Sequence, residues 1–152
     1  MEVSNLKKEL LEAFTKDTLK KLGLPNTPAS YVELGAKFFV TALQNSNVDQ
    51  FSIAKYCYRI AADAGYAEGQ AALGSTCMHD LDGEKDFKQA EYWARKAADQ
   101  GNLNGMYGLG TCYCINGDYK NAEYWLQKAA DGGHPQAAET LETIKILSNL
   151  GN

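Results

Sequence analysis

The chain has 152 residues, of which 45% are hydrophobic and 22% are charged. This length and composition suit one domain with a core of ordinary size. The formal net charge of −4 argues against a nucleic-acid binder, because such a protein needs a basic surface to displace counterions from phosphates. The sequence also lacks an apolar run long enough to cross a bilayer. We therefore expect neither nucleic acid nor a membrane among its partners.

The N-terminal residues and the cysteines bear on where in the cell the protein is expected. Residues 1–9 lack the basic-then-apolar order of a signal peptide. The four cysteines form no CxxC pair, and they do not combine with the two histidines at zinc-binding spacing. We therefore expect free thiols, a cytoplasmic location, and no metal ion or other cofactor.

An amphipathic helix is predicted first, over about residues 3–22. Its apolar residues recur at helical spacing: Val3, Leu6, Leu10 and Phe14. The segment from Gly23 to Pro28 interrupts this helix. Thr27 followed by Pro28 predicts an N-cap with proline at the first position of a second helix.

Self-similar segments follow this break. They begin at Ala54, Ala90 and Ala122, and each carries a Tyr two residues later and ends in Ala-Ala-Asp. The starts are 36 and then 32 residues apart, which is the period of a stacked helical hairpin. The chain is therefore expected to be an array of hairpins.

A second motif precedes each of these segments. It is a Leu-Gly pair with a small residue one helical turn before the leucine, and it occurs as Ser30 with Leu34, Gly69 with Leu73, and Gly105 with Leu109. The frame recurs as Ala137 with Leu141. Small residues at this spacing let a neighbouring helix approach closely, which gives a packing reason for glycine inside a helix.

Two sets of helices alternate in this scheme. The first helices of the hairpins are expected at about residues 28–44, 67–79, 103–115 and 135–149. The second helices are expected at about residues 49–64, 86–100 and 118–132. Asp86 and Asp118 are predicted N-caps, and Gly65, Gly101 and either Gly132 or Gly133 are predicted to end the second helices. The Tyr and Trp residues of the second helices are expected to belong to the core.

These residues resemble the Sel-1-like repeats, a branch of the tetratricopeptide-like superfamily. The closest unit carries Leu109-Gly110-Thr111-Cys112-Tyr113, Asp118, Ala122, Trp125, Lys128-Ala129-Ala130 and Gly133. The unit over residues 69–101 has Cys77 in place of the Tyr, and the unit over residues 30–65 is degenerate. The inter-helix turns are shorter than usual for the family, at Asp82-Gly83 and Asn116-Gly117. The resemblance implies a concave groove that holds proteins or peptides, and it implies no reaction.

The expected fold is all-α, an α-solenoid forming a right-handed superhelix of antiparallel hairpins, with about three repeats and a capping helix at each end. The expected parts are an N-terminal capping helix within residues 1–24 and a repeat domain over residues 28–152, whose units span about 28–65, 66–101 and 102–133 before a C-terminal capping helix at 134–150. A monomer is favoured.

The first helices should line the concave side. The expected partner-binding residues there are Val32, Phe39, Glu68, Ser75, Met78, His79, Asn104, Tyr107, Thr111, Cys114, Ile115 and Glu139. Their apolar members favour a non-enzymatic module that takes an extended or helical peptide with apolar anchors. A competing interpretation is that Phe39 and Val40 are covered by the N-terminal helix. Adaptor or scaffold and inhibitor or immunity-type roles both remain open, and the net charge slightly favours a basic patch on the partner.

A chemical role is the alternative function. Cys112 and Cys114 point to different sides of a helix, so they cannot share a metal ion. A small-molecule or thiol-based site using Cys114 and His79 is the remaining enzymatic hypothesis. His134 is interpreted as a cap residue, and His79 with Asp80 and Asp82 is interpreted as turn chemistry rather than as a metal site.

Overall fold

The computed structural model describes residues 2–79 and 86–150, with side chains for 7–79 and 86–149. These residues form helices and no strand. The helices are α1 (Glu2–Lys21), α2 (Pro28–Asn45), α3 (Val48–Asp63), α4 (Ala67–Thr76), α5 (Phe87–Asp99), α6 (Leu103–Ile115), α7 (Tyr119–Asp131) and α8 (Ala137–Leu150). The all-α prediction is confirmed. The predicted turn at Asp82-Gly83, the Asp80 and Asp82 pair and the side chains of Val3 and Leu6 lie outside the described part.

Local capping fixes most of the helix ends. The Thr27 side chain accepts a hydrogen bond from the Ser30 N–H, and the Asp86 carboxylate accepts from the Lys88 and Gln89 N–H groups. Gly65, Gly101 and Gly133 have φ values of 80°, 83° and 89°, which L side chains adopt with strain. Gly133, rather than Gly132, therefore takes the left-handed position after α7.

Two predicted boundaries are wrong. α4 ends at Thr76 rather than near residue 79, because the chain turns there and the Cys77 carbonyl accepts a hydrogen bond from the Asp86 N–H at 2.9 Å. α8 begins at Ala137 rather than at Pro135. The residues before it form a turn in which the Gln136 N–H donates to His134 Nδ1 at 3.3 Å.

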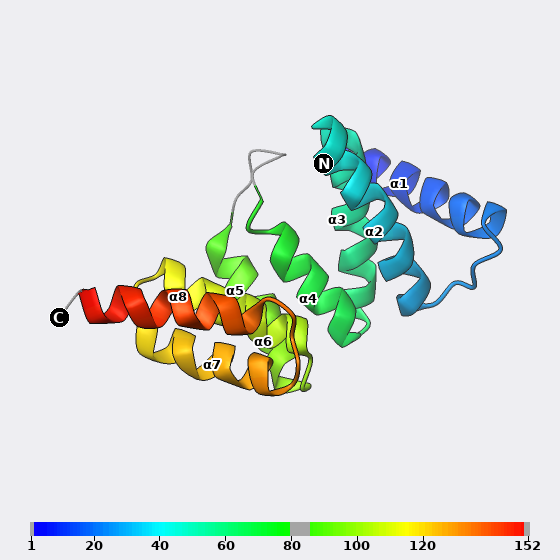
Figure 1. Ribbon diagram of the computed structural model, residues 1–152. Coiled ribbons are helices and arrows are strands. Elements are labelled where there is room, and N and C mark those ends of the chain that lie inside the picture. Colours follow the sequence, from blue (N-terminus) through cyan, green and yellow to red (C-terminus); the bar gives the residue numbers. More distant parts are fainter. Residues whose placement is uncertain (1, 80–85, 151–152) are drawn as a thin grey trace.

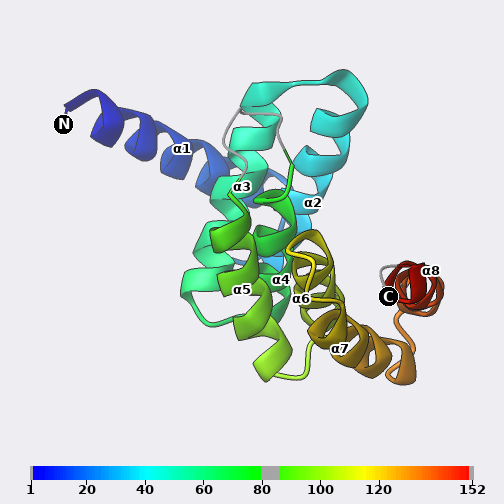
Figure 2. The same ribbon diagram turned by 90° about the vertical axis from the view of Figure 1, so that its left-hand side faces the viewer.

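The helices form two layers (Figure 1). Figure 2 shows α3 and α5 on one side of α2, α4 and α6, and α7 below α6 on the way to α8. From α2 onward, consecutive helices pack together, α1 packs on α3, and α2 also packs on α4 and α4 on α6. Contacts between alternate helices on this side bring the first helices closer together than the second ones. The α2, α4 and α6 side is therefore the concave one, as the repeat frame predicts.

Glycines allow the closest approach between the layers. A Cβ built on Gly69 would lie 2.5 Å from the Ala61 Cβ, and one built on Gly105 would lie 2.5 Å from the Ala97 Cβ. Real Cβ atoms do not approach one another so closely. The small residues of the Leu-Gly frame therefore repeat because each hairpin must pack against the one before it.

The core runs along the stack between the layers. Trp93 is only 5% exposed and clusters with residues of four helices: Ala54, Tyr58, Ala62, Leu73, Cys77, Ala90 and Cys112. The expectation that every Tyr and Trp of the second helices is a core residue is wrong. Tyr92 is 48% exposed and Tyr124 is 53% exposed, because each comes one residue before the Trp that turns inward and lies edge-on against that Trp.

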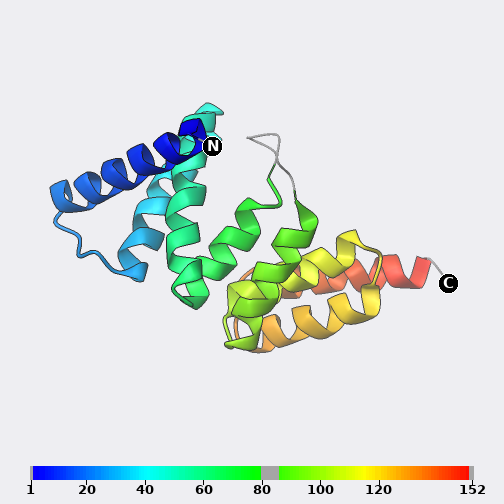
Figure 3. The same ribbon diagram turned by 180° about the vertical axis from the view of Figure 1, so that it is seen from behind.

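The N-terminal helix caps one end of the stack. Seen from behind, α1 runs across the α2–α3 end (Figure 3). Its Leu19 is buried with Tyr31 and Cys57, and its Phe14 ring lies 6.0 Å from the Phe38 ring. Within the described residues, no helix is both long and apolar enough to cross a membrane.

Candidate functional site

A groove of 360 Å³ opens on the concave side. We call it the central groove, and its lining residues are Val32, Phe39, Tyr58, Glu68, Ala71, Ala72, Ser75, Met78, Asn104, Tyr107, Gly108, His134 and Gln136. They come from α2, α3, α4, α6 and the turns next to α4 and α8. Its size is within the range of sites that hold a small ligand or a few peptide side chains.

Helical spacing brings these side chains to one surface. On α2, Val32 and Phe39 are seven residues apart, which is two helical turns. On α4, Glu68, the adjacent pair at 71–72 and Ser75 follow at intervals of three or four. Asn104 and Tyr107 repeat this spacing on α6. Three successive hairpins therefore each contribute one stripe to the same groove.

The apolar wall of the central groove is continuous with the core. The Phe39 ring lies 5.9 Å from the Phe51 ring, 6.3 Å from the Tyr58 ring and 5.3 Å from the His79 ring. Met78 packs against the buried cluster around Leu73. Burial raises the pKa of Tyr58 to about 12, so its phenol is neutral at the floor of the groove. This wall is preformed rather than assembled on binding.

His134 and Tyr107 form the opposite wall. Their rings stack with centroids 4.4 Å apart and planes 14° apart, and the Tyr107 hydroxyl lies 3.4 Å from the Thr140 hydroxyl. His134 is buried, and its loss of hydration lowers its pKa. The prediction that His134 only caps a helix missed this role. The repeat pattern gives no signal for it, because the residue after the terminal glycine differs in each unit, as Tyr66, Asn102 and His134.

The structure brings seven of the twelve predicted partner-binding residues together in the central groove. These are Val32, Phe39, Glu68, Ser75, Met78, Asn104 and Tyr107. The competing interpretation, in which α1 covers Phe39 and Val40, is wrong. Phe39 faces the groove, Val40 is 53% exposed, and Phe38 is the residue that contacts α1.

The other five predicted residues lie beyond this lining. The His79 ring lies 5.3 Å from the Phe39 ring in an edge-on arrangement. Thr111 donates to the Tyr107 carbonyl, and Ile115 is exposed at the end of α6. Cys114 packs toward the cluster of α7 and α8, and Glu139 is exposed in the first turn of α8. They flank the central groove rather than form it.

The thiols are mostly buried. None of the four cysteines forms a disulfide, and Cys57, Cys77 and Cys112 are buried. Burial raises the pKa of Cys57 to about 12 and that of Cys112 to about 11, and it also raises the pKa of Cys114. A raised pKa leaves less nucleophilic thiolate at neutral pH. Because Cys114 and His79 pack in different clusters, the geometry does not bring together the pair on which the enzymatic alternative depends.

Metal-binding geometry is also lacking in the described part of the chain. Over residues 7–79 and 86–149, no group of three His, Cys, Asp or Glu side chains converges on one point. The central groove combines apolar walls with the polar side chains of Glu68, Ser75, Asn104 and Gln136.

A family model described as Sel1 repeat matches residues 41–66, 67–102 and 104–134. The last two segments correspond to the hairpins α4–α5 and α6–α7, and the first covers the end of α2 together with α3. No curated protein matches the chain. Sel1 repeats are generally protein-interaction modules. With three matched units over more than half of its length and the stacked hairpins expected of them, the chain belongs to the Sel1 repeat family.

Proposed function

We propose that this protein is a non-enzymatic, cytoplasmic interaction module that holds a peptide segment of a partner protein in the central groove. The observation that carries this proposal is a set of three apolar side chains, Phe39, Met78 and Tyr107, which lie on the two walls of the groove, come from three successive hairpins and line the concave side. A preformed apolar surface of this kind binds apolar side chains with little loss of conformational entropy. An adaptor and an inhibitor that occludes its target would both use it.

A further observation supports the proposal. None of the four cysteines forms a disulfide and three of them are buried, which fits a reducing compartment.

Blocking the central groove tests the proposal. Ser75 is exposed and lines the groove from α4, so Ser75→Tyr should fill the space without disturbing the core. Gln89→Tyr introduces the same side chain at an exposed position of α5, in the other layer. Both variants should keep the melting temperature of the wild type, because exposed helix positions tolerate substitution.

The readout is affinity capture from a cell lysate, followed by mass spectrometry. A protein captured by the wild type and by Gln89→Tyr, but at least tenfold less by Ser75→Tyr, would support binding in the central groove. Equal capture by all three forms would contradict it.

A further inference from the structure

The lining of the central groove contains one carboxylate and no positively charged side chain. Glu68 is the only acidic or basic residue of the lining apart from His134, whose pKa is lowered by burial. α4 and α6, which form the middle of the concave side, contain no lysine or arginine. On α2, Lys37 pairs with Glu33 at 3.0 Å, and neither residue lines the groove.

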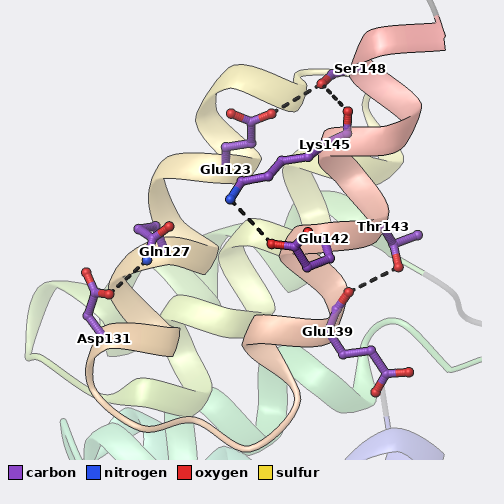
Figure 4. A network of polar contacts seen from close by, with 8 residues as sticks. All are labelled: Glu123, Gln127, Asp131, Glu139, Glu142, Thr143, Lys145 and Ser148. Atoms are coloured by element: carbon purple, nitrogen blue, oxygen red, sulfur yellow. Dashed lines mark hydrogen bonds and ion pairs between the residues drawn. The ribbon is translucent and has the colours of Figure 1, made fainter.

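The Glu68 carboxylate is available to a ligand. It is exposed at the edge of the central groove, and none of the described residues forms an ion pair with it. Glu139 adds a second negative charge one turn after Gln136, which lines the groove. In Figure 4 the Glu139 carboxylate points away from Lys145, whose ammonium pairs with Glu142 at 3.6 Å.

The lysines and arginines of the hairpins lie mostly on the other layer. Lys96 lies 5.0 Å from the centre of the Tyr92 ring, and Lys128 lies 4.6 Å from that of Tyr124. Arg59 lies 5.3 Å from the Trp93 ring centre. These cations lie on α3, α5 and α7, which also carry acidic residues, so the groove differs from that side in having no cation among its lining residues.

The helix N-termini at the groove do not make it favourable for anionic ligands. The N-termini of α4 and α6 lie at the groove, and such ends attract anions. However, Glu68 occupies the first turn of α4, and the Asn102 side chain accepts a hydrogen bond from the Gly105 N–H at 2.8 Å at the start of α6. A carboxylate ligand would therefore lose hydration without gaining a cationic partner.

We infer that the central groove takes a peptide segment in which a lysine or arginine lies close to an apolar side chain, with the apolar side chain between Phe39, Met78 and Tyr107 and the cation at Glu68. This inference rests on the proposed function and specifies the chemistry of its partner. Segments rich in Asp or Glu and free C-terminal carboxylates are disfavoured, because like charges repel across an interface.

A random peptide library of about twelve residues tests this selectivity, because it offers every charge pattern at once. The library is selected on the wild type, and each selected peptide is then measured against Ser75→Tyr by fluorescence anisotropy. Peptides that lose at least tenfold in affinity with Ser75→Tyr bind in the central groove. We expect these peptides to be enriched in Lys and Arg near an apolar residue and depleted of Asp and Glu.

Glu68→Gln then tests the contribution of the carboxylate charge, because it removes the charge and keeps the shape of the side chain. It should weaken the groove-binding peptides about three- to tenfold, which is the range of one partly exposed ion pair at an interface. Glu33→Gln is the matched control, since it removes one carboxylate from α2 outside the groove and should leave affinity unchanged. The wild-type affinity should also fall between about 50 and 300 mM salt, and the fall should be smaller for Glu68→Gln.

The results distinguish a failure of the charge selectivity from a failure of the proposed function. Groove-binding peptides without an excess of Lys or Arg, or with affinities unaffected by Glu68→Gln, would overturn the charge selectivity and leave the proposed function intact. If every selected peptide bound Ser75→Tyr as well as the wild type, the proposed function would fail and this inference would fail with it.

Discussion

The concave and convex sides of this protein are built from the same repeats but use them differently. On the convex side, α5 and α7 carry the same sequence pattern, so that Tyr92 with Lys96 and Tyr124 with Lys128 form equivalent contacts. On the concave side, equivalent positions differ from unit to unit: Glu68 corresponds to Asn104, and Ser75 to Thr111. The repeated positions include the core residues and these exposed surface pairs, whereas the positions that vary include those that line the central groove.

Neighbouring residues of the convex layer differ in burial. Substituting the buried one gives the largest expected loss of stability. Trp93→Ala should lower the free energy of unfolding by about 3–5 kcal/mol, because it removes a large buried ring that joins four helices. Tyr92→Ala should cost less than about 1 kcal/mol, since it removes an exposed ring and one contact with Lys96. Urea unfolding followed by circular dichroism measures both.

The two variants are controls for each other, because both remove an aromatic ring from the same turn of α5. Equal losses would show that Tyr92 belongs to the core, as the sequence alone suggests. Near-zero loss for Trp93→Ala would mean that the stack does not depend on a continuous core.

The next largest loss of stability is expected where the two layers are in close contact. Gly69→Ala should destabilise the protein by about 1–3 kcal/mol, because the new methyl group would lie 2.5 Å from the Ala61 Cβ and helices would have to separate. Gly108→Ala is the matched control within a helix. Its methyl group would meet only the Ala94 Cβ, at 3.6 Å, so the higher helix propensity of alanine should stabilise the protein by up to about 1 kcal/mol.

The two substitutions are expected to change stability in opposite directions. Thermal unfolding should show a lower melting temperature for Gly69→Ala and a slightly higher one for Gly108→Ala. A gain in stability for both would mean that the repeated glycines are not required for packing.

The sequence is sufficient for features that repeat and insufficient for those that do not. Periodicity and caps place α6 at its observed residues, and the small-residue frame identifies Gly69 and Gly105 as contact points. Pro135 suggests a helix start, but the turn held by His134 delays α8 until Ala137. The Tyr107–His134 wall was missed because the position of His134 carries a different residue in each unit, so the repeat pattern does not single it out.

A smaller loss of stability is expected at the start of α6, where Asn102 caps the helix and Asn104 lines the central groove. Asn102→Ala should cost about 1 kcal/mol, because the Gly105 N–H loses its capping acceptor. Asn104→Ala, two residues later, should leave stability within about 0.5 kcal/mol, because Asn104 is exposed and lines the central groove. Thermal unfolding of the two variants checks the difference, and a larger loss for Asn104→Ala would contradict the assignment of Asn102 as the cap.

The smallest effect concerns pH. Burial lowers the pKa of His134, so between this lowered value and the value of about 6.5 in the unfolded chain, the unfolded state binds more protons than the folded state. Stability from His134 is therefore present above about pH 6.5 and is lost as the pH falls through the folded-state pKa. His134→Phe keeps a flat ring against Tyr107 but cannot titrate.

The measurement is the melting temperature of both proteins between about pH 7.5 and about pH 5.5, a range that includes the ordinary pKa of histidine. The wild type should lose stability on acidification, and His134→Phe should lose less over the same range. At the upper pH the variant should be slightly less stable, because the Gln136 N–H loses its contact with Nδ1. An equal acid sensitivity of both proteins would assign the pH dependence to other groups and leave His134 a purely steric part of the groove wall.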